Sequence, residues 1–545
     1  MKKVLLIVYL LALVFASNAQ TAPQKFWVQF TDKSNSSYSI SSPQAFLSDR
    51  ALERRAKSGI AITEQDIPVN QAYINQVLAI GDLFLLHESK WFNSISIFCP
   101  DSVLMLQVSA LPFVQLTRNV NRFETEPIEV TSTRAATSTS ENMDYGASFT
   151  QIEQINGLPL HQRGFKGEGI YIGVLDAGFR FYSILPIFEK ARNEGRISPV
   201  RDFAEVDFDV DGHSNHGTYV LSTMAGYDEG NLIGTAPDAN YFLFRTEDSD
   251  SEFVIEEDNW VAAVEMADKL GIDVINSSLG YSLFDNPTHD HSYADMNGET
   301  ARISIAAQIA ASKGMLVVTS AGNSGSSPWK YITAPGDAKD ILTIGAVTGD
   351  GIHAAFSGFG PTADGRVKPN VMAMGQAATF ASLDSTFIQG NGTSFSSPIL
   401  CGMAACLWQA HPNKTNMEII SAIEESAHLY NAPNDSMGFG IPDFWKAHLV
   451  LREPDSVEPP EVLIYPNPNQ GKFRFEFLNA ENTSELADVR VMDALGKEIF
   501  KTCVGRSENH FFGEVTLVDL ADGIYFLELL FDDQRVVERF QIVSQ

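Results

Sequence analysis

Short apolar segments alternate with longer segments of helical periodicity through the middle of the chain. The apolar segments cover residues 170–175, 241–244, 274–276, 315–318 and 341–344, and the helical pattern is clearest over 260–269 and 301–313. Strands that are apolar on both faces are typical of a parallel sheet covered by helices on both sides. We therefore predict an α/β domain over residues 150–450, with its reactive groups beyond the carboxyl ends of the strands.

The N-terminal region, residues 20–124, has a mixed pattern of strands and amphipathic helices. Strands are predicted at 26–30, 83–86 and 95–98, helices at 43–57 and 69–80, and a further helix and strand between 103 and 116. Elements of these lengths can form one sheet with helices on one face. This pattern indicates a small, separate α+β domain.

The C-terminal region, residues 462–545, consists of strand-like segments separated by turns. Three of them are residues 473–477, 489–492 and 525–529. An antiparallel β-sandwich accommodates such a pattern. Two linkers separate the three domains: 125–149, which has seven hydroxyl residues among residues 131–140, and 451–461, which is rich in proline and acidic residues.

Residues 1–19 have the features of an export signal. Lys2 and Lys3 precede an apolar run that ends at Phe15, and small residues lie at Ser17 and Ala19. The run of about twelve residues is shorter than the ~20 that span a bilayer. We predict cleavage after Ala19 and no transmembrane anchor; the alternative is a buried N-terminal helix.

Composition narrows the class of protein. With 38 basic and 68 acidic residues the formal net charge is −30, which disfavours nucleic acid as a partner. The 44% hydrophobic and 19% charged residues are typical of a folded globular protein. The four cysteines form neither a disulfide scaffold nor a zinc motif, and Cys401 and Cys406 are expected in the core of a helix.

Three residues of the central domain are placed where a reactive group can be held rigidly. Asp176 follows a buried strand, His216 lies near the start of a helix, and Ser394 precedes an apolar helix predicted over residues 399–408. Each alone has an ordinary explanation, such as a helix cap or a backbone contact. Together they supply a nucleophile, a base to remove its proton, and a carboxylate to orient that base.

A fourth candidate is Asn323, which follows the strand at 315–318 and is flanked by Gly322 and Gly325. An amide N–H directed at a developing oxyanion can lower a reaction barrier by ~3 kcal/mol. An ordinary Asn-Gly turn is the alternative.

The sequence blocks around these residues resemble the signature blocks of the subtilisin-like serine proteases. They are Val174-Leu175-Asp176-Ala177-Gly178, His216-Gly217-Thr218, Ala321-Gly322-Asn323 and Gly392-Thr393-Ser394-Phe395-Ser396-Ser397-Pro398. The resemblance implies a seven-stranded parallel sheet between helices, with Ser394 as nucleophile, His216 as general base and acid, Asp176 as its orienting carboxylate and Asn323 as oxyanion donor.

The same resemblance implies where a peptide substrate would bind. The substrate is expected to pair as an extended strand with Ser278, Leu279 and Gly280, opposite Ser320, Ala321 and Gly322. This chain departs from the family pattern at Ala177, where Thr or Ser is usual, at Tyr219, where His is usual, and at Phe395, where Met is usual. With Ala177 in place of Thr or Ser, we expect a less polar environment for the carboxylate of Asp176.

The two flanking domains carry weaker resemblances. Residues 91–97 and 111–114 are similar to propeptides of this family, which assist folding and block the active site; an independent N-terminal domain is the alternative. Residues 465–471, 493–497 and 521–526 resemble the C-terminal sorting domains of type IX secretion in Bacteroidetes. This implies secretion, or display at the cell surface, through the periplasm and outer membrane. The alternative is an accessory β-sandwich that binds substrate or carbohydrate.

The sequence therefore predicts a secreted serine endopeptidase that is made as a zymogen. Its expected partners are protein or peptide substrates, its own propeptide as inhibitor, and the type IX secretion machinery. No cofactor or metal is expected in the chemistry; structural calcium is possible, but no ligands are assigned, since the segment from Asp207 to Thr218 lacks the last EF-hand ligand. A peptide ligase or cyclase with the same triad, and a non-catalytic surface peptide-binding protein, are the alternatives.

Overall fold

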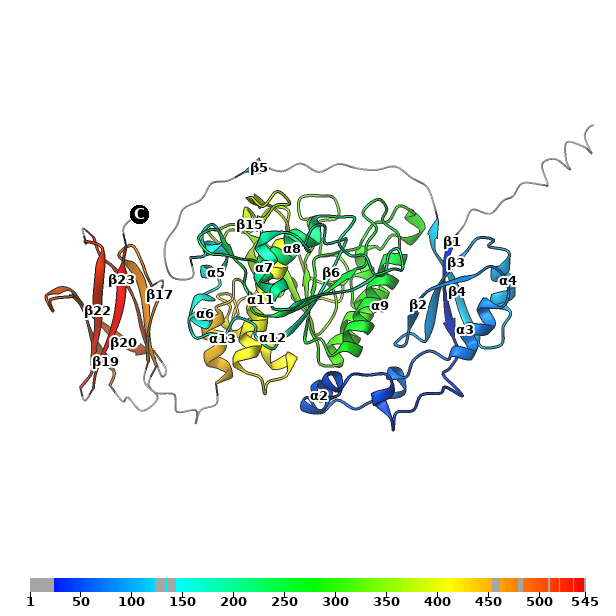
Figure 1. Cartoon of the computed structure of the whole chain (residues 1–545), viewed down its shortest axis with the longest axis horizontal. Helices are drawn as coiled ribbons and strands as arrows, with labels where there is room; N and C mark the ends of the chain where they lie inside the picture. The colour runs from blue at the N-terminus through cyan, green and yellow to red at the C-terminus, as the bar shows by residue number, and fades with distance from the viewer. Residues whose placement is uncertain are drawn as a thin grey trace, which may run out of the picture.

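A computed structural model of the chain describes residues 24–122, 133–134, 144–452, 461–465, 467–478, 484–507, 510–518, 520–532 and 534–543. The predicted signal peptide, residues 1–19, lies outside the described residues, as does most of the predicted linkers 125–149 and 451–461. Three folded units follow one another along the chain, drawn in blue, in cyan to yellow, and in orange to red (Figure 1). None of the helices in the described ranges is long and apolar enough to cross a lipid bilayer.

The N-terminal unit is a four-stranded antiparallel sheet in the order β2-β3-β1-β4, packed against helices over its own core. Its elements are β1 (Gln24–Phe30), α2 (Asp49–Lys57), α3 (Gln71–Leu78), β2 (Phe84–Ser89), β3 (Ser94–Cys99), α4 (Leu104–Ser109) and β4 (Val114–Arg122). The single helix predicted over 43–57 was wrong. A 3₁₀ turn (Pro43–Ala45) precedes α2, and Ser48 separates the two because its Oγ caps α2 by accepting from the backbone N of Ala51 at 3.2 Å.

The central unit contains the predicted seven-stranded parallel sheet, in the order β14-β13-β12-β11-β6-β10-β7. The strands are β6 (Tyr171–Asp176), β7 (Ile197–Asp202), β10 (Asn240–Arg245), β11 (Val274–Ser277), β12 (Leu316–Ser320), β13 (Leu342–Val347) and β14 (Val371–Met374). Successive side chains of a strand point to opposite faces. Val174 therefore belongs to one hydrophobic core and its neighbour Leu175 to the other.

Helices cover both faces of this sheet, as predicted (Figure 1). The core that contains Leu175 includes residues of α9 (Ile255–Leu270) and α10 (Arg302–Ser312). The core that contains Val174 includes residues of α5 (Phe149–Glu153), α6 (Leu158–Gln162), α8 (His216–Ala225), α11 (Thr393–Ala410), α12 (Asn416–Ser426) and α13 (Phe444–Leu451). A hairpin of β15 (Ala378–Ala381) and β16 (Phe387–Gly390) leads into α11.

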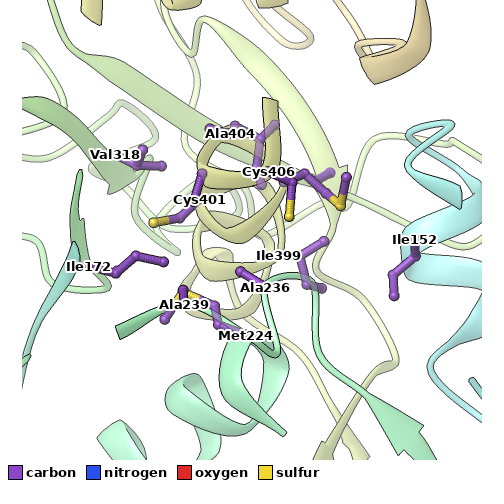
Figure 2. Close-up of a cluster of buried hydrophobic side chains, with 14 of the residues drawn as sticks. Ile152, Ile172, Met224, Ala236, Ala239, Val318, Ile399, Cys401, Ala404 and Cys406 are labelled. Carbon is purple, nitrogen blue, oxygen red and sulfur yellow. The ribbon is translucent and has the colours of Figure 1, made fainter. Parts of the chain in front are cut away.

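Helix α11 passes through the larger core, where Figure 2 shows it among side chains from several elements. Cys401 and Cys406 are fully buried on it and unpaired, which confirms their interpretation as core residues. The predicted start of this helix at residue 399 was wrong: α11 begins at Thr393 and contains Pro398 in its interior. Because proline has no N–H, the carbonyl of Ser394 has no helical donor at that position.

The C-terminal unit is antiparallel, in the order β17-β18-β21-β20-β19-β22-β23. The strands are β17 (Glu461–Tyr465), β18 (Lys472–Leu478), β19 (Leu486–Asp493), β20 (Glu498–Ser507), β21 (His510–Thr516), β22 (Gly523–Leu530) and β23 (Arg535–Ile542). Alternate residues such as Phe473, Phe475 and Phe477 face one shared core. The predicted antiparallel sandwich is confirmed.

Candidate active site

Asp176 and His216 meet at the carboxyl end of the central sheet. Asp176 is the last residue of β6 and is fully buried, and His216 is the first residue of α8. Oδ1 of Asp176 accepts hydrogen bonds from Nδ1 of His216 and from the backbone N of Ala177, both at 2.8 Å. A Cβ on Gly217 would lie 2.5 Å from the carbonyl oxygen of Gly178, so only glycine lets α8 approach β6 this closely.

The carboxylate controls the charge of the imidazole. Partial burial opposes protonation of His216, but the charge of Asp176 and its hydrogen bond outweigh burial and raise the pKa of His216 above its usual value of 6.5. The His216 side chain keeps 34% of its surface exposed. The other carboxylate oxygen, Oδ2 of Asp176, is buried and has no hydrogen-bond partner among the described residues. Ala177 has no hydroxyl to offer it.

Ser394 lies in the first turn of α11 and exchanges two hydrogen bonds with Ser278. Oγ of Ser278 donates to the carbonyl oxygen of Ser394 at 2.9 Å, the oxygen that Pro398 leaves without a helical donor. Oγ of Ser394 donates to the carbonyl oxygen of Ser278 at 3.3 Å. The nucleophile candidate is thus fixed to the first residue after β11.

The imidazole of His216 lies next to the same turn, with its ring centroid 6.3 Å from that of Phe395. The structure therefore brings Asp176, His216 and Ser394 to one place, although the Ser394 hydroxyl donates to Ser278 and not to the imidazole. Catalytic hydrogen bonds are often long or misaligned without substrate, and a rotation about χ1 of the serine redirects its hydroxyl.

Asn323 lies in the loop after β12, and its amide is oriented by Thr393. Its Oδ1 accepts from the backbone N and the Oγ1 of Thr393, at 2.9 and 3.0 Å. Its Nδ2 then faces Gly392, where it would be 3.8 Å from an added Cβ. Gly322 has φ +88, a conformation that favours glycine and turns the chain sharply before Asn323. The amide donor is therefore held next to the Ser394 turn.

The six residues predicted to bind substrate line two neighbouring segments. Ser278, Leu279 and Gly280 follow β11, and Ser320, Ala321 and Gly322 follow or end β12, its parallel neighbour. Oγ of Ser320 donates to the carbonyl oxygen of Leu279 at 3.1 Å, which ties the two segments together. The sequence analysis did not single out Thr333, a loop residue with no pattern around it, whose side chain lies against both Gly280 and Gly322.

The N-terminal unit lies against α9 of the central unit (Figure 1). A buried ionic cluster that was not predicted from the sequence joins the two units. Asp268 of α9 pairs with Arg54 at 2.6 Å, Lys90 at 2.7 Å and Arg55 at 2.8 Å. Burial favours the neutral acid, but these cations together hold the pKa of Asp268 well below its usual value.

Glu265, one turn earlier on α9, receives three donors from the same unit. They are Oγ of Ser89 at 2.6 Å and the backbone N atoms of Lys90 and Trp91 at 2.7 and 3.0 Å. Burial raises the pKa of Glu265 to about 7.

A short strand after the N-terminal unit, β5 (Thr133–Arg134), pairs with β16 in antiparallel fashion. Strand β16 ends at Gly390, four residues before Ser394. Part of the segment between the N-terminal and central units therefore lies at the hairpin that leads to the nucleophile candidate.

The described residues offer no metal centre. No group of three His, Cys, Asp or Glu side chains in these ranges is arranged to hold a metal ion. Asp211 lies in the loop that opens like an EF-hand. Its carboxylate accepts one hydrogen bond from the backbone N of Phe181 and another from the hydroxyl of Ser183.

Comparison with known proteins assigns each unit to a family. Residues 167–440 match the subtilase family, residues 25–138 the peptidase S8 propeptide domain of Bacteroidota, and residues 463–543 the secretion system C-terminal sorting domain.

Similar curated proteins are subtilisin NAT of Bacillus subtilis subsp. natto and M-protease of Shouchella clausii (strain KSM-K16). The first is 29% identical over 291 residues, which is 53% of this chain and 67% of that protein. The second is 25% identical over 386 residues, 70% of this chain and 88% of that protein. Among solved structures, MycP1 from Mycobacterium smegmatis is 22% identical with a TM-score of 0.45, covering 59% of this chain and 89% of MycP1.

The parallel sheet, the site at its carboxyl edge and the family match together define a subtilase. The chain belongs to the subtilase family and carries that family's propeptide domain before the catalytic domain. Its C-terminal sorting domain makes it a secreted or cell-surface protein.

Proposed function

We propose that this protein is a secreted serine endopeptidase that hydrolyses peptide bonds through an acyl-enzyme on Ser394. The observation that carries the proposal is the 2.8 Å hydrogen bond between Nδ1 of His216 and the buried Asp176, next to the turn that holds Ser394. This bond fixes the imidazole with Nε2 as the basic atom.

The reaction follows from these positions. Nε2 of His216 takes the proton of Ser394 Oγ as that oxygen attacks the substrate carbonyl, and Asp176 stabilises the imidazolium that forms. Nδ2 of Asn323 and the backbone N–H of Ser394, in the first turn of α11, donate to the resulting oxyanion. His216 then protonates the leaving amine, and a water molecule, deprotonated by His216, releases the acyl group.

We further propose that the N-terminal domain inhibits its own catalytic domain until it is removed. Three buried cations on Asp268 and three donors on Glu265 support a tight complex that persists after the chain is cut. The pairing of β5 with β16 supports processing in the segment between residues 122 and 144.

Hydrolysis of denatured casein by the processed protein and its Ser394→Ala variant tests the proposal. Wild type is expected to give peptides whose summed masses gain one water for each cut, and the variant is expected to give none. Products without that gain of water would indicate a ligase or cyclase. Binding of casein without any cut would indicate a peptide-binding protein.

A further inference from the structure

Three aromatic rings stack in a row between α8 and α11, the helices that carry His216 and Ser394. They are Tyr219 of α8, Phe380 of β15 and Phe395 of α11. The ring centroids of Tyr219 and Phe380 are 4.9 Å apart, and those of Phe380 and Phe395 are 4.3 Å apart, with planes 17° from parallel. Phe380 is therefore the middle ring and contacts both helices.

Each end of the stack lies beside a reacting side chain. Phe395 directly follows Ser394, and its ring centroid is 6.3 Å from that of the His216 imidazole. Tyr219 lies on the next turn of α8, and its Oη accepts a hydrogen bond at 2.8 Å from Nδ2 of Asn215, the residue before His216. The rings thus connect the start of α8 to the start of α11.

Hydrogen bonds hold the two reacting side chains to different strands. His216 is bonded to Asp176, at the end of β6, and Ser394 is bonded to Ser278, directly after β11. Among the described residues, no hydrogen bond joins His216 to Ser394. The distance between these two side chains therefore depends on what packs between their helices.

The hairpin of β15 and β16 holds the middle ring in place. Phe380 and Phe395 are both buried. A Cβ on Gly390 of β16 would lie 2.7 Å from Cε1 of Phe380 and 3.3 Å from Cε2 of Phe395, so only glycine fits against the two rings. The backbone N of Ala381 donates to Oγ of Ser222 of α8 at 3.0 Å. Because such an interior is closely packed, a change in the middle ring shifts its neighbours.

Building on the proposed function, we infer that Phe380 is a positioning residue for the reaction: with Tyr219 and Phe395 it sets the distance between Nε2 of His216 and Oγ of Ser394. Tyr219 and Phe395 are two of the three positions at which this chain departs from the family pattern. Phe380 stacks on both, so the two departures depend on each other. A displacement of about 1 Å between reacting groups can lower a rate by about 10²-fold. The stack therefore controls the rate of acylation and not the binding of substrate.

Steady-state kinetics of the processed enzyme on one internally quenched peptide test this inference. Phe380→Leu keeps an apolar side chain but removes the ring, and it is expected to lower kcat by about ten-fold with little change in KM. Phe444→Leu is the control, because Phe444 is fully buried in the same core but lies on α13, outside the stack. It is expected to lose thermal stability and to keep the wild-type kcat.

Two results would overturn the inference: an unchanged kcat in Phe380→Leu, or an equal loss of kcat in Phe380→Leu and Phe444→Leu. Thermal unfolding verifies that the variants are folded. If Phe380→Leu is not folded, Phe380→Met takes its place, because methionine fills a similar volume without a ring. The expected loss of kcat is the same.

A double-mutant cycle tests whether the rings act as one stack. Tyr219→Phe and Tyr219→Leu both lose the hydroxyl that is bonded to Asn215, but only Tyr219→Leu loses the ring. The kcat of Tyr219→Leu is expected to be about five-fold below that of Tyr219→Phe, and the two are expected to be equal in the Phe380→Leu background, where the stack is already interrupted. The same five-fold difference in both backgrounds would overturn the inference.

Failure of the proposed function has a different signature. In that case wild type cuts no peptide and a serine-directed phosphonate does not label Ser394, and the inference fails with it. Failure of the inference alone leaves wild type active and labelled at Ser394, with the same kcat in Phe380→Leu.

Discussion

Nδ1 of His216 donates a 2.8 Å hydrogen bond to a carboxylate oxygen of Asp176, a residue with no exposed surface. This bond sets both the tautomer and the charge of the imidazole.

The activity should depend on pH through His216. Burial opposes protonation, but Asp176 raises the pKa of His216 above 6.5. Catalysis needs the neutral imidazole, so kcat/KM should fall as the pH drops through that raised pKa and reach half its maximum above pH 6.5. A pH profile of kcat/KM for one peptide checks this. A half-maximum well below pH 6 would contradict it.

Asp176→Asn should lower kcat by about 10³–10⁴-fold, because the amide favours the wrong tautomer of His216. It should also move the acid limb of the pH profile to lower pH, since burial remains while the two larger influences that raise the pKa of His216, the charge of Asp176 and its hydrogen bond, are lost and only the charge of Glu247 is left. The same pH profile measures both effects. If the acid limb stayed at its wild-type pH, the titration of a group other than His216 would be responsible for it.

Ala177→Thr should stabilise the protein by about 1 kcal/mol relative to Ala177→Val. Oδ2 of Asp176 is buried without a partner, and a hydroxyl on the adjacent residue supplies a donor that valine, of the same shape, does not. Both variants in the Ser394→Ala background can be compared by urea unfolding. Equal midpoints would show that the hydroxyl does not reach Oδ2.

Asn323→Asp should lower kcat by about 10²–10³-fold or more with little change in KM. The carboxylate still accepts both hydrogen bonds from Thr393, so the loop is kept, but Nδ2 is replaced by an acceptor that repels an oxyanion. Steady-state kinetics and comparison with Asn323→Ala check this. A full rate in either variant would remove Asn323 from the oxyanion site.

Asp268→Asn should release the propeptide after processing. Removal of one partner from a buried ion cluster costs about 3–5 kcal/mol, because Arg54 and Lys90 lose the carboxylate they pair with and Arg55 keeps only Asp66. Size-exclusion chromatography of processed protein should show the propeptide bound in wild type and separated in the variant. Asp350→Asn, an exposed site with the same change of charge, is the control and should retain the propeptide.

The parallel sheet and the residues at its carboxyl edge could be predicted from the sequence. Strand β6 is continuously apolar up to Asp176, and Gly217, next to His216, marks a close backbone approach. The start of α11 was missed because Pro398 was expected in the first turn of the helix. The helix begins earlier, at Thr393, because Ser278, distant in the sequence, donates the hydrogen bond to the Ser394 carbonyl that Pro398 cannot.

Contacts between distant segments could not be predicted from local patterns. Thr333 lies in a loop, and its position under Gly280 depends on the backbone bridge between Tyr281 and Ala334. Asp268 lies near the end of a helix, where an acidic residue usually faces water; its burial requires Arg54 and Arg55 from another domain.

The most direct test of the account is mass spectrometry of the processed enzyme after rapid acid quench with a slowly hydrolysed ester substrate. We expect a single acyl group on the peptide that contains Ser394, absent from Ser394→Ala. An acyl group on any other residue, or casein hydrolysis retained by Ser394→Ala, would contradict the proposed mechanism.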